Sequence, residues 1–238
     1  MKIAILSDIH ANLAALQAVL GQAKGADLIV CLGDIVDYGP QPAECIDLIR
    51  ANALIAVMGN HDFAVAHNAD PRCSPAYAHL AAVTRDYTVT TLGGPMKRYL
   101  SALPLRERFE RAGYSFSAVH ASPSNRLYNY LRPDTSDGVW ESEIEFDNRP
   151  DVLLLGHTHL PMVKQVGGTL IVNPGSVGQP KDGDPEASYA VWEDGKVTIH
   201  RVEYDVWATA RAYERTDLAP TDVARLVAIL RSGGLEKP

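Results

Sequence analysis

Short apolar runs alternate with amphipathic stretches along the first quarter of the chain. Three continuous apolar runs lie at residues 2–6, 27–32 and 54–58, and such runs are typical of strands covered on both faces. Between them the sequence predicts a helix that begins after the candidate N-cap Asn12 and a second helix over about residues 41–50. This order of elements predicts an α/β layered fold with parallel strand pairing.

The rest of the chain predicts further helices and three hairpins. Helices are expected over residues 76–92, 96–103 and 135–146, the last with Val139, Trp140 and Ile144 facing inward. A single buried strand is expected at 151–155. Hairpins are expected at 106–119, at 161–172 and at 187–204, where Asp194-Gly195 forms the turn. We expect one domain over residues 1–238, with C-terminal helices at about 205–233.

The charge of the chain limits its partners. A formal net charge of −7 argues against binding long nucleic acids, which requires a basic surface, but it leaves room for a small phosphorylated molecule at a local site. No run approaches the roughly 20 apolar residues that span a bilayer, so no membrane partner is expected. The three cysteines form no C-x-x-C pair, and the N-terminus has no signal sequence, so we expect a cytoplasmic protein. The sequence leaves the oligomeric state open.

Metal-binding side chains directly follow the predicted strands. Seven oxygen or nitrogen donors stand at these strand ends: Asp8, His10, Asp34, Asn60, His120, His157 and His159. Seven donors exceed the needs of one metal ion, and two divalent ions fit the number if one carboxylate bridges them. Mixed imidazole and carboxylate ligands suit Mn, Fe, Zn, Co or Ni. Two neighbouring ions can hold the attacking and leaving oxygens of a phosphoryl displacement.

The order of these motifs resembles the signature of the calcineurin-like metallophosphoesterases. The motifs are Asp8-x-His10, Gly33-Asp34, Gly59-Asn60-His61-Asp62, His120 and Gly156-His157-x-His159. The chain is similar in particular to the short bacterial and archaeal branch, which includes phosphodiesterases and in which Asn173-Pro174-Gly175-Ser176 follows the last histidines. The resemblance implies a four-layer αββα sandwich, with two mixed β-sheets flanked by helices and a two-metal site at the strand ends.

The resemblance also implies a role for each motif residue. It assigns Asp8, His10 and His159 to one metal ion, assigns Asn60, His120 and His157 to the other, and makes Asp34 the bridge. A hydroxide between the ions would attack phosphorus in line. His61 would protonate the leaving oxygen or stabilise the charged transition state, and Asp62 would orient His61. Asp62 could instead cap the helix that follows it.

Substrate contacts are less determined by the sequence. Tyr38, Arg126, Asn173, Gly175 and Ser176 are candidates because they lie near motif residues. The turn that begins at Asn173 could either connect two strands or line the site with its N–H groups. The loop at residues 179–184 could be a mobile surface loop or a rim of the substrate site.

Function is expected to be hydrolysis of a small phosphodiester or phosphomonoester, with a nucleotide as one option and manganese as the activating ion. Activity like that of a serine/threonine protein phosphatase or a dinucleoside tetraphosphatase is the alternative within the enzyme class. A non-catalytic metal-binding scaffold is the alternative of another class. Eroded ligand sets are typical of such scaffolds, whereas this chain keeps every ligand and His61.

Overall fold

Side chains of β1 (Lys2–Leu6) alternate between the two faces of their sheet, as the period of a β-strand requires. Ile3 and Ile5 pack on one face, in the core between two sheets, while Ala4 and Leu6 pack on the other face, in a core shared with helices. All four side chains are fully buried. The apolar run at the N-terminus is therefore a strand with a core on each side.

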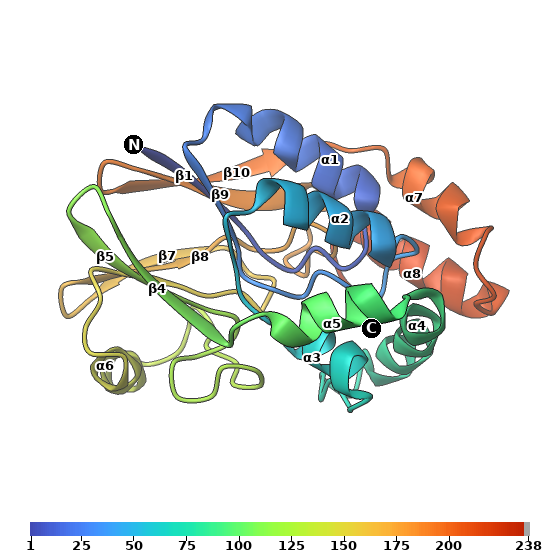
Figure 1. The fold of residues 1–238 in the computed structure, drawn as a ribbon, viewed down its shortest axis with the longest axis horizontal. Coiled ribbons are helices and arrows are strands. Elements are labelled where there is room, and N and C mark those ends of the chain that lie inside the picture. The colour runs from blue at the N-terminus through green and yellow to red at the C-terminus, as the bar shows by residue number, and fades with distance from the viewer. Residues whose placement is uncertain (236–238) are drawn as a thin grey trace.

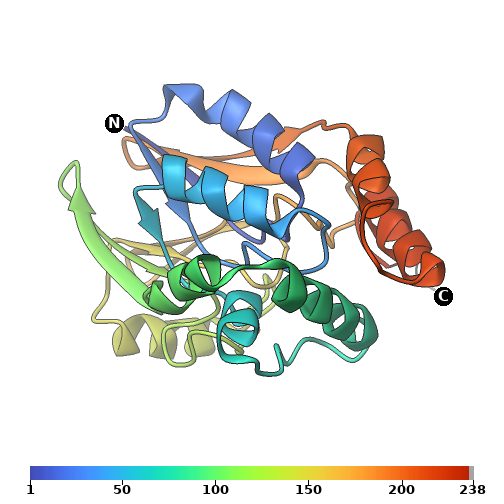
Figure 2. The same cartoon turned by 45° about the vertical axis from the view of Figure 1, so that its right-hand side comes forward.

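Two five-stranded sheets form the centre of the protein. The structure is a computed structural model that describes residues 1–235. The first sheet has the strand order β10-β9-β1-β2-β3 and the second β4-β5-β6-β8-β7, and both contain parallel and antiparallel pairs. In Figures 1 and 2, α1 and α2 cover the outer side of the first sheet and α6 lies outside the second. This arrangement confirms the predicted αββα sandwich.

The elements have the following bounds. The first sheet contains β1, β2 (Leu28–Cys31), β3 (Ile55–Ala56), β9 (Ala187–Glu193) and β10 (Lys196–Val202). The second contains β4 (Arg106–Arg111), β5 (Tyr114–Val119), β6 (Val152–Leu154), β7 (Met162–Val166) and β8 (Thr169–Asn173). The α-helices are α1 (Leu13–Gln22), α2 (Pro42–Asn52), α3 (Asn60–His67), α4 (Ala78–Thr91), α5 (Gly94–Ala102), α6 (Asp137–Phe146), α7 (Val206–Tyr213) and α8 (Pro220–Ser232).

Aromatic side chains fill part of the space between the sheets. Trp192 of β9 and Phe116 of β5 meet edge to face, with ring centroids 5.2 Å apart, and Phe109 of β4 stacks on Phe116 at 4.8 Å. Phe116 and Trp192 are almost completely buried. Large aromatic rings contribute strongly to such a core because each removes a large apolar area from water. This core holds the two sheets, and hence the two sets of strand ends, against each other.

Two expectations differ from the structure at element edges. The third strand spans only Ile55–Ala56; the N–H of Val57 still donates to the carbonyl of Cys31 at 3.0 Å, but that of Met58 donates outside the sheet, to the carbonyl of Pro104 at 2.8 Å. Leu54, expected inside this strand, is 75% exposed. On α6, Trp140 and Ile144 are buried as expected, but Val139 is 44% exposed. Val139 precedes Trp140 directly, and adjacent helical residues point in different directions.

The C-terminal helices are fastened to loops that follow β1 and β2. Asn12 caps α1 by accepting a hydrogen bond from the N–H of Ala15 at 3.3 Å, and its side-chain oxygen also accepts from the Thr209 hydroxyl at 2.8 Å. The hydroxyl of Tyr213 donates to the carbonyl of Tyr38 at 2.8 Å. Both partners lie beside predicted metal ligands, so α7 braces the loops that carry them.

Parallel pairing brings polar loops of both sheets to one edge of the sandwich. β1, β2 and β3 run parallel in the first sheet, and β5, β6 and β8 run parallel in the second. The carboxyl ends of parallel strands meet at a common edge, where α/β proteins place their sites.

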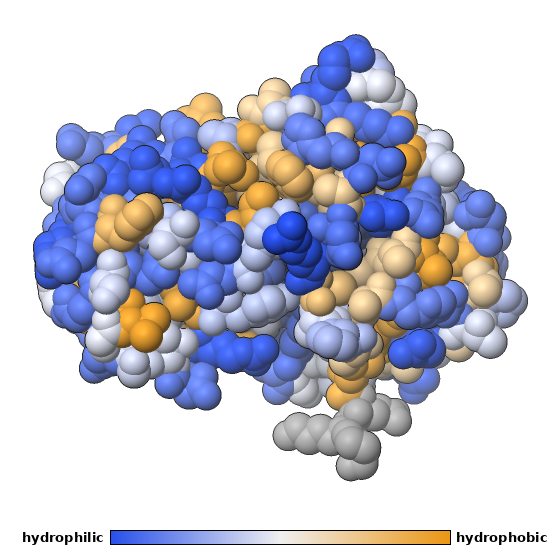
Figure 3. Space-filling model, turned by 90° about the horizontal axis from the view of Figure 1, so that it is seen from below, coloured by the Kyte–Doolittle hydropathy of each residue, from blue (hydrophilic) through white to orange (hydrophobic). Residues whose placement is uncertain are grey.

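Figure 3 shows the lower face of Figure 1, which is mostly hydrophilic with apolar side chains in small separate groups. None of the helices within residues 1–235 combines the length and apolarity needed to cross a membrane.

Candidate metal centre

All seven predicted ligands converge at this common edge. Asp8 and His10 follow β1, Asp34 follows β2, Asn60 opens α3 after β3, His120 follows β5, and His157 and His159 follow β6. Each of these side chains is at most 3% exposed. Two compact groups result, Asp8 with His10 and His159, and Asp34 with His120 and His157; within each group one ligand atom per residue lies within 4.8 Å of the others.

In the first group, two imidazole nitrogens face each other and a carboxylate. Nε2 of His10 lies 3.2 Å from Nε2 of His159, which lies 3.3 Å from Oδ1 of Asp8. Nδ1 of His10 donates to the carbonyl of Val36 at 3.1 Å, and Nδ1 of His159 donates to the carbonyl of Gln179 at 2.5 Å. A carbonyl can only accept, so each Nδ1 carries the proton and each neutral ring turns a lone pair on Nε2 toward the other.

In the second group a backbone carbonyl orients His120 in the same way, and the side-chain amide of Asn60 lies beside it. Nδ1 of His120 donates to the carbonyl of Leu32 at 2.7 Å, which leaves Nε2 3.0 Å from Oδ1 of Asn60 and 3.2 Å from Oδ2 of Asp34. The amide nitrogen of Asn60 donates to the carbonyl of Pro71 at 2.8 Å, and this bond turns the amide oxygen toward His120. Backbone carbonyls therefore orient the ligands of both groups.

Asp34 belongs to the second group but also reaches toward the first. Its Oδ2 lies 3.2 Å from Nε2 of His120 and 3.8 Å from Nε2 of His10, so one carboxylate oxygen is within 4 Å of a ligand nitrogen from each group. Its Oδ1 accepts a hydrogen bond from the N–H of His61 at 2.8 Å. This is the position required of a carboxylate that bridges two ions.

The donors present fit divalent metal ions. Facing lone pairs repel one another unless a cation lies between them, and buried polar atoms normally have partners. Within residues 1–235, the buried atoms Oδ1 of Asp8 and Nε2 of His157 have no hydrogen-bond partner. Both belong to the two groups, and both would gain a partner if cations were bound. Imidazole, carboxylate and amide donors without a thiolate are the ligands of first-row divalent ions.

Backbone conformation at the site is unusual. Asp8, His10, Asp34, His157 and His159 all have φ between 47° and 66°, a left-handed conformation that costs a non-glycine residue about 1–3 kcal/mol. Gly59 lies so close to Asp34 that an added Cβ would stand 2.0 Å from Oδ1 of Asp34. Strain and close approach on this scale persist where the surrounding structure holds a functional arrangement.

Comparison with known proteins agrees with this geometry. The family model of the calcineurin-like phosphoesterase superfamily domain matches residues 1–194. The chain belongs to this superfamily.

Proteins similar to this calcineurin-like phosphoesterase cover most of its length. An uncharacterised protein of Methanocaldococcus jannaschii is 37% identical and covers 90% of each chain. The phosphodiesterase YfcE of Escherichia coli is 29% identical, over 84% of this chain and 91% of its own. A crystal structure of a metallophosphoesterase from Sphaerobacter thermophilus is 35% identical, with a TM-score of 0.79, over 98% of this chain and 99% of its own. The two candidate ligand groups agree with the two-metal sites of the family.

Charges in the centre of this phosphoesterase compensate one another. Burial lowers the pKa of His10, His157 and His159 well below the usual range, so these rings are neutral, the form that binds metals. Burial also opposes charge on His120, but the neighbouring Asp34 carboxylate raises the pKa of this ring to about 9. Burial raises the pKa of Asp8 to about 6. A centre with these competing carboxylates and imidazoles is suited to hold positive charge.

The partner of His61 is Asp37 and not Asp62. Nδ1 of His61 donates to Oδ2 of Asp37 at 2.9 Å, and both side chains are buried. Asp37 stands three residues after Asp34 and was not among the site residues expected from the sequence. The expectation that Asp62 orients His61 is wrong in this geometry, because the Asp62 carboxylate accepts from the N–H groups of Gly59 at 3.0 Å and Ile35 at 2.9 Å. Asp62 thus caps its helix and ties it to the Asp34 loop.

The turn that begins at Asn173 supports the ligand loops from behind. The Asn173 amide donates to the carbonyl of Gly156 at 2.8 Å, and the Ser176 hydroxyl donates to the carbonyl of Asp8 at 2.8 Å. The N–H of Gly175 donates to the Asn173 side chain, and that of Gly178 to the Asp8 carbonyl, both at 3.0 Å. These two N–H groups are therefore committed within the protein, which favours the connecting turn over the anion site among the two alternatives left open by the sequence.

Tyr38 and Arg126 have different surroundings. Tyr38 is 2% exposed, and its ring meets the ring of His10 edge to face at 4.8 Å and lies 5.0 Å from that of His61. Tyr38 therefore holds two imidazoles in place and is too deeply buried to be a broad substrate contact. Arg126 is half-buried, and within residues 1–235 no polar contact joins its guanidinium to the ligands.

Two residues beside the centre were missed as site residues. The Lys181 ammonium lies 3.2 Å from Nε2 of His159, and burial lowers the pKa of Lys181 to about 8. The Tyr130 ring lies against that of His157, tilted by 30° with ring centroids 4.0 Å apart. Lys181 falls in the loop that the sequence left as either mobile surface or substrate rim, and its contact with His159 supports the rim.

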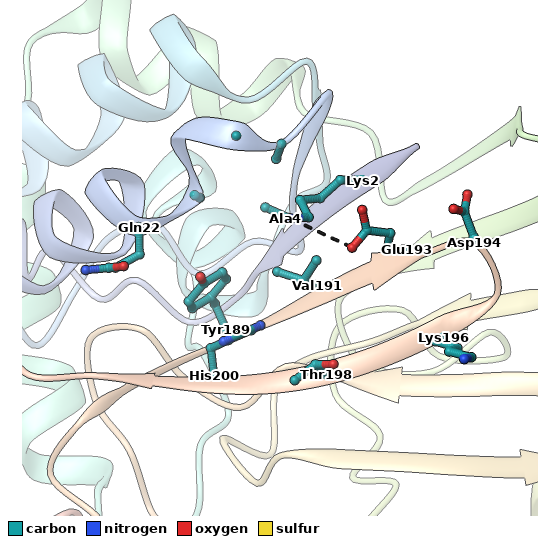
Figure 4. Close-up of a pocket in the computed structure, with 13 residues that line it drawn as sticks. Lys2, Ala4, Gln22, Tyr189, Val191, Glu193, Asp194, Lys196, Thr198 and His200 are labelled. Carbon is teal, nitrogen blue, oxygen red and sulfur yellow. Dashed lines mark ion pairs between the residues drawn. The ribbon is translucent and has the colours of Figure 1, made fainter.

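A hollow of about 690 Å³ lies away from the metal centre, beside β1, β9, β10 and the end of α1 (Figure 4). Its wall includes Lys2 at the start of β1, whereas the metal ligands follow the other end of this strand. Lys2 pairs with Glu193 at 3.7 Å, and His200 stacks on Tyr189 with centroids 5.0 Å apart. Lys2 and the two rings thus have partners of their own, and the metal ligands lie at the opposite end of β1.

Proposed function

We propose that the protein hydrolyses a small phosphodiester or phosphomonoester with two divalent metal ions. The single observation that carries this proposal is the place of Asp34, whose Oδ2 lies within 4 Å of Nε2 of His10 and of Nε2 of His120. A carboxylate shared between two ligand groups is the arrangement that keeps two ions close together. Two such ions, if bound, would stabilise both the attacking and the leaving oxygen of a phosphoryl transfer.

The ligands divide between two positions. Asp8, His10 and His159 would hold one ion, Asn60, His120 and His157 would hold the other, and Asp34 would contribute to both. When bound, the ions supply a water nucleophile and neutralise charge on the phosphate. Nitrogen and oxygen donors of this kind accept Mn, Fe, Zn, Ni or Co, and we propose Mn²⁺ for activity.

His61 is the proposed general acid. Its Nδ1 is taken by Asp37 at 2.9 Å, so Nε2 is the nitrogen left to donate to the leaving oxygen or to a charged phosphate oxygen. Burial opposes a charge on His61, but Asp34 and Asp37 raise its pKa above the ordinary value, which favours the protonated form that an acid requires. Asp37 is thus a positioning residue that acts through His61.

The substrate is proposed to be a small molecule. A diester is supported by the relative named a phosphodiesterase, and the acidic balance of 29 Asp and Glu against 22 Lys and Arg disfavours long nucleic acids. The complete ligand set, the buried His61–Asp37 pair and the strained backbone favour an enzyme over a scaffold that only binds a partner.

The direct test is hydrolysis of p-nitrophenyl phosphate and bis(p-nitrophenyl) phosphate. We expect turnover with Mn²⁺, loss of turnover on chelation, and recovery when Mn²⁺ is restored. The control is His61→Ala, which should keep its metal content and lose about 100-fold or more in rate. Full metal loading without turnover of either ester or of any phosphorylated nucleotide tested would overturn the proposal in favour of a scaffold.

A further inference from the structure

A second hollow, of about 400 Å³, opens directly beside the metal centre. Three of its lining residues touch or connect the two ligand groups. Thr158 stands between His157 and His159 in the chain, the Tyr130 ring lies against that of His157 with centroids 4.0 Å apart, and the Lys181 ammonium lies 3.2 Å from Nε2 of His159. A substrate with its phosphate at the metal centre would therefore have its remaining part in this hollow.

The wall of the hollow comes from separate parts of the chain. Ser232, the last residue of α8, and residues 233–235 after it form one side and lie against the loop that carries Lys181. The N–H of Gly183 donates to the carbonyl of Gly233 at 2.9 Å, and an added Cβ on Gly233 would stand 2.5 Å from the backbone of Asp184. Close backbone packing thus fixes this side of the hollow against the metal centre.

Two cations line the hollow, and each is supported by an aromatic ring. The Lys181 ammonium lies 4.5 Å from the ring centroid of Tyr77, and the Arg132 guanidinium lies 5.7 Å from that of Tyr130. Contacts of this kind hold a cation in place while leaving its N–H groups available to an anion. Within residues 1–235, neither cation forms an ion pair with a carboxylate.

The one carboxylate that lines the hollow in the described part of the chain is neutralised from outside it. Asp182 is bound by the guanidinium of Arg201 on β10. The charged side chains of the hollow therefore leave a positive balance, although the chain as a whole has a net charge of −7. A positive hollow in an acidic protein, next to a phosphate-handling centre, favours a ligand with more than one anionic group.

Lys181 contacts a ligand of the metal centre, whereas Arg132 does not. Nε2 of His159 cannot accept from the Lys181 ammonium and also donate its lone pair to a metal ion, so with the ligand group loaded Lys181 must bind another acceptor. An oxygen of the substrate is the acceptor that this position offers. Arg132 contacts no ligand of the centre and is placed for a group beyond the reacting phosphate, and its planar fork suits a phosphate.

We propose that this hollow binds a second phosphate of the substrate, with Lys181 at the edge of the reacting phosphate and Arg132 as the residue that selects the second one. The substrate class is then a small phosphoester that carries a further phosphate on its alcohol part, such as a nucleoside bisphosphate. This inference rests on the proposed phosphoesterase function and names the specificity of the same site.

The experiment compares adenosine 3′-phosphate with adenosine 3′,5′-bisphosphate, which differ by one phosphate. The Mn²⁺-loaded wild-type protein is expected to prefer the bisphosphate in kcat/KM. Arg132→Gln should lower this preference about tenfold or more, as expected for a lost charge-assisted contact. The matched control is Arg50→Gln, because Arg50 also lies over a tyrosine ring, that of Tyr99 at 5.3 Å, but does not line the hollow. An unchanged preference in Arg132→Gln would overturn the proposal.

Equilibrium dialysis with the bisphosphate separates this inference from the proposed function. If the bisphosphate binds Arg132→Gln more weakly than wild type while the metal content is unchanged, the proposed second-phosphate site is supported, even if no substrate is hydrolysed. Lack of hydrolysis would count only against the proposed phosphoesterase function. If the nitrophenyl esters are hydrolysed but wild type and Arg132→Gln bind the bisphosphate equally, the phosphoesterase function stands. The proposal that the hollow binds a second phosphate is then overturned. Lys181→Met serves as the second variant and is expected to weaken binding of both nucleotides while keeping the metal ions.

Discussion

The carboxylate of Asp37 lies 2.9 Å from Nδ1 of His61, and both groups are buried. This contact fixes which imidazole nitrogen faces the substrate, because the Nδ1–H donates to the Asp37 carboxylate and leaves Nε2 for the substrate. The same contact makes the pair act as a unit. Asp37 lies in the same loop as Asp34, between β2 and α2, so one loop supplies both the shared ligand and the partner of the proposed acid.

Asp37→Ala is expected to lower kcat by about 10- to 100-fold without loss of metal, because the His61 ring loses the partner that orients it. In a His61→Ala background the same change should have almost no further effect, since residues that act through one another are not additive. Rates and metal content of both single variants and the double variant provide the measurement. Full additivity of the two losses would show that Asp37 acts by another route.

Asp62 is expected to affect stability instead. Its carboxylate accepts from the N–H groups of Gly59 at 3.0 Å and Ile35 at 2.9 Å, and Asp62→Ala leaves these buried donors without partners. The free energy of unfolding should fall by about 1–3 kcal/mol for each unsatisfied group. Urea denaturation of Asp62→Ala and Asp37→Ala side by side measures the difference. If Asp62→Ala is as stable as wild type but inactive, Asp62 has a catalytic role after all.

Gly59 is expected to tolerate no side chain. An added Cβ would stand 2.0 Å from Oδ1 and 2.3 Å from the backbone N of Asp34, so Gly59→Ala must displace the shared ligand. We expect weaker binding of both metal ions together with a lower melting temperature. Gly138→Ala on α6 is the matched control, because nothing lies within 4 Å of its added Cβ. Normal metal binding by Gly59→Ala would mean that the Asp34 loop can move at little cost.

The sequence predicts the parallel strands well because the signals are local and strong, whereas the two-sheet sandwich was expected from the family resemblance. Continuous apolar runs mark strands with a core on each side, and Asp194-Gly195 marks the hairpin of β9 and β10. The donors at strand ends could also be found, since parallel strands bring their carboxyl ends together. Spacing does not determine the directions of side chains in loops, so Asp62 was assigned the contact that Asp37 makes.

Contacts between distant segments could not be predicted from the sequence. Lys181 meets His159 across 22 positions, and Tyr77 supports Lys181 from α4's N-terminal side. The turn after Asn173 is similar, because the same Asn, Gly and Ser residues can either present N–H groups to an anion or satisfy them internally. Only the neighbouring carbonyl of Asp8, brought there by the fold, decides between these two uses.

The measurement closest to the central claim is the metal content of purified, reconstituted protein by elemental analysis, for wild type, His10→Ala, His120→Ala and Asp34→Ala. A shared carboxylate between two ligand groups predicts about two ions per wild-type chain. It also predicts selective loss of one ion in each histidine variant and weaker binding of both ions in Asp34→Ala. A wild-type chain that binds at most one ion, or an Asp34→Ala chain that binds two with unchanged affinity, would contradict the two-metal centre described above.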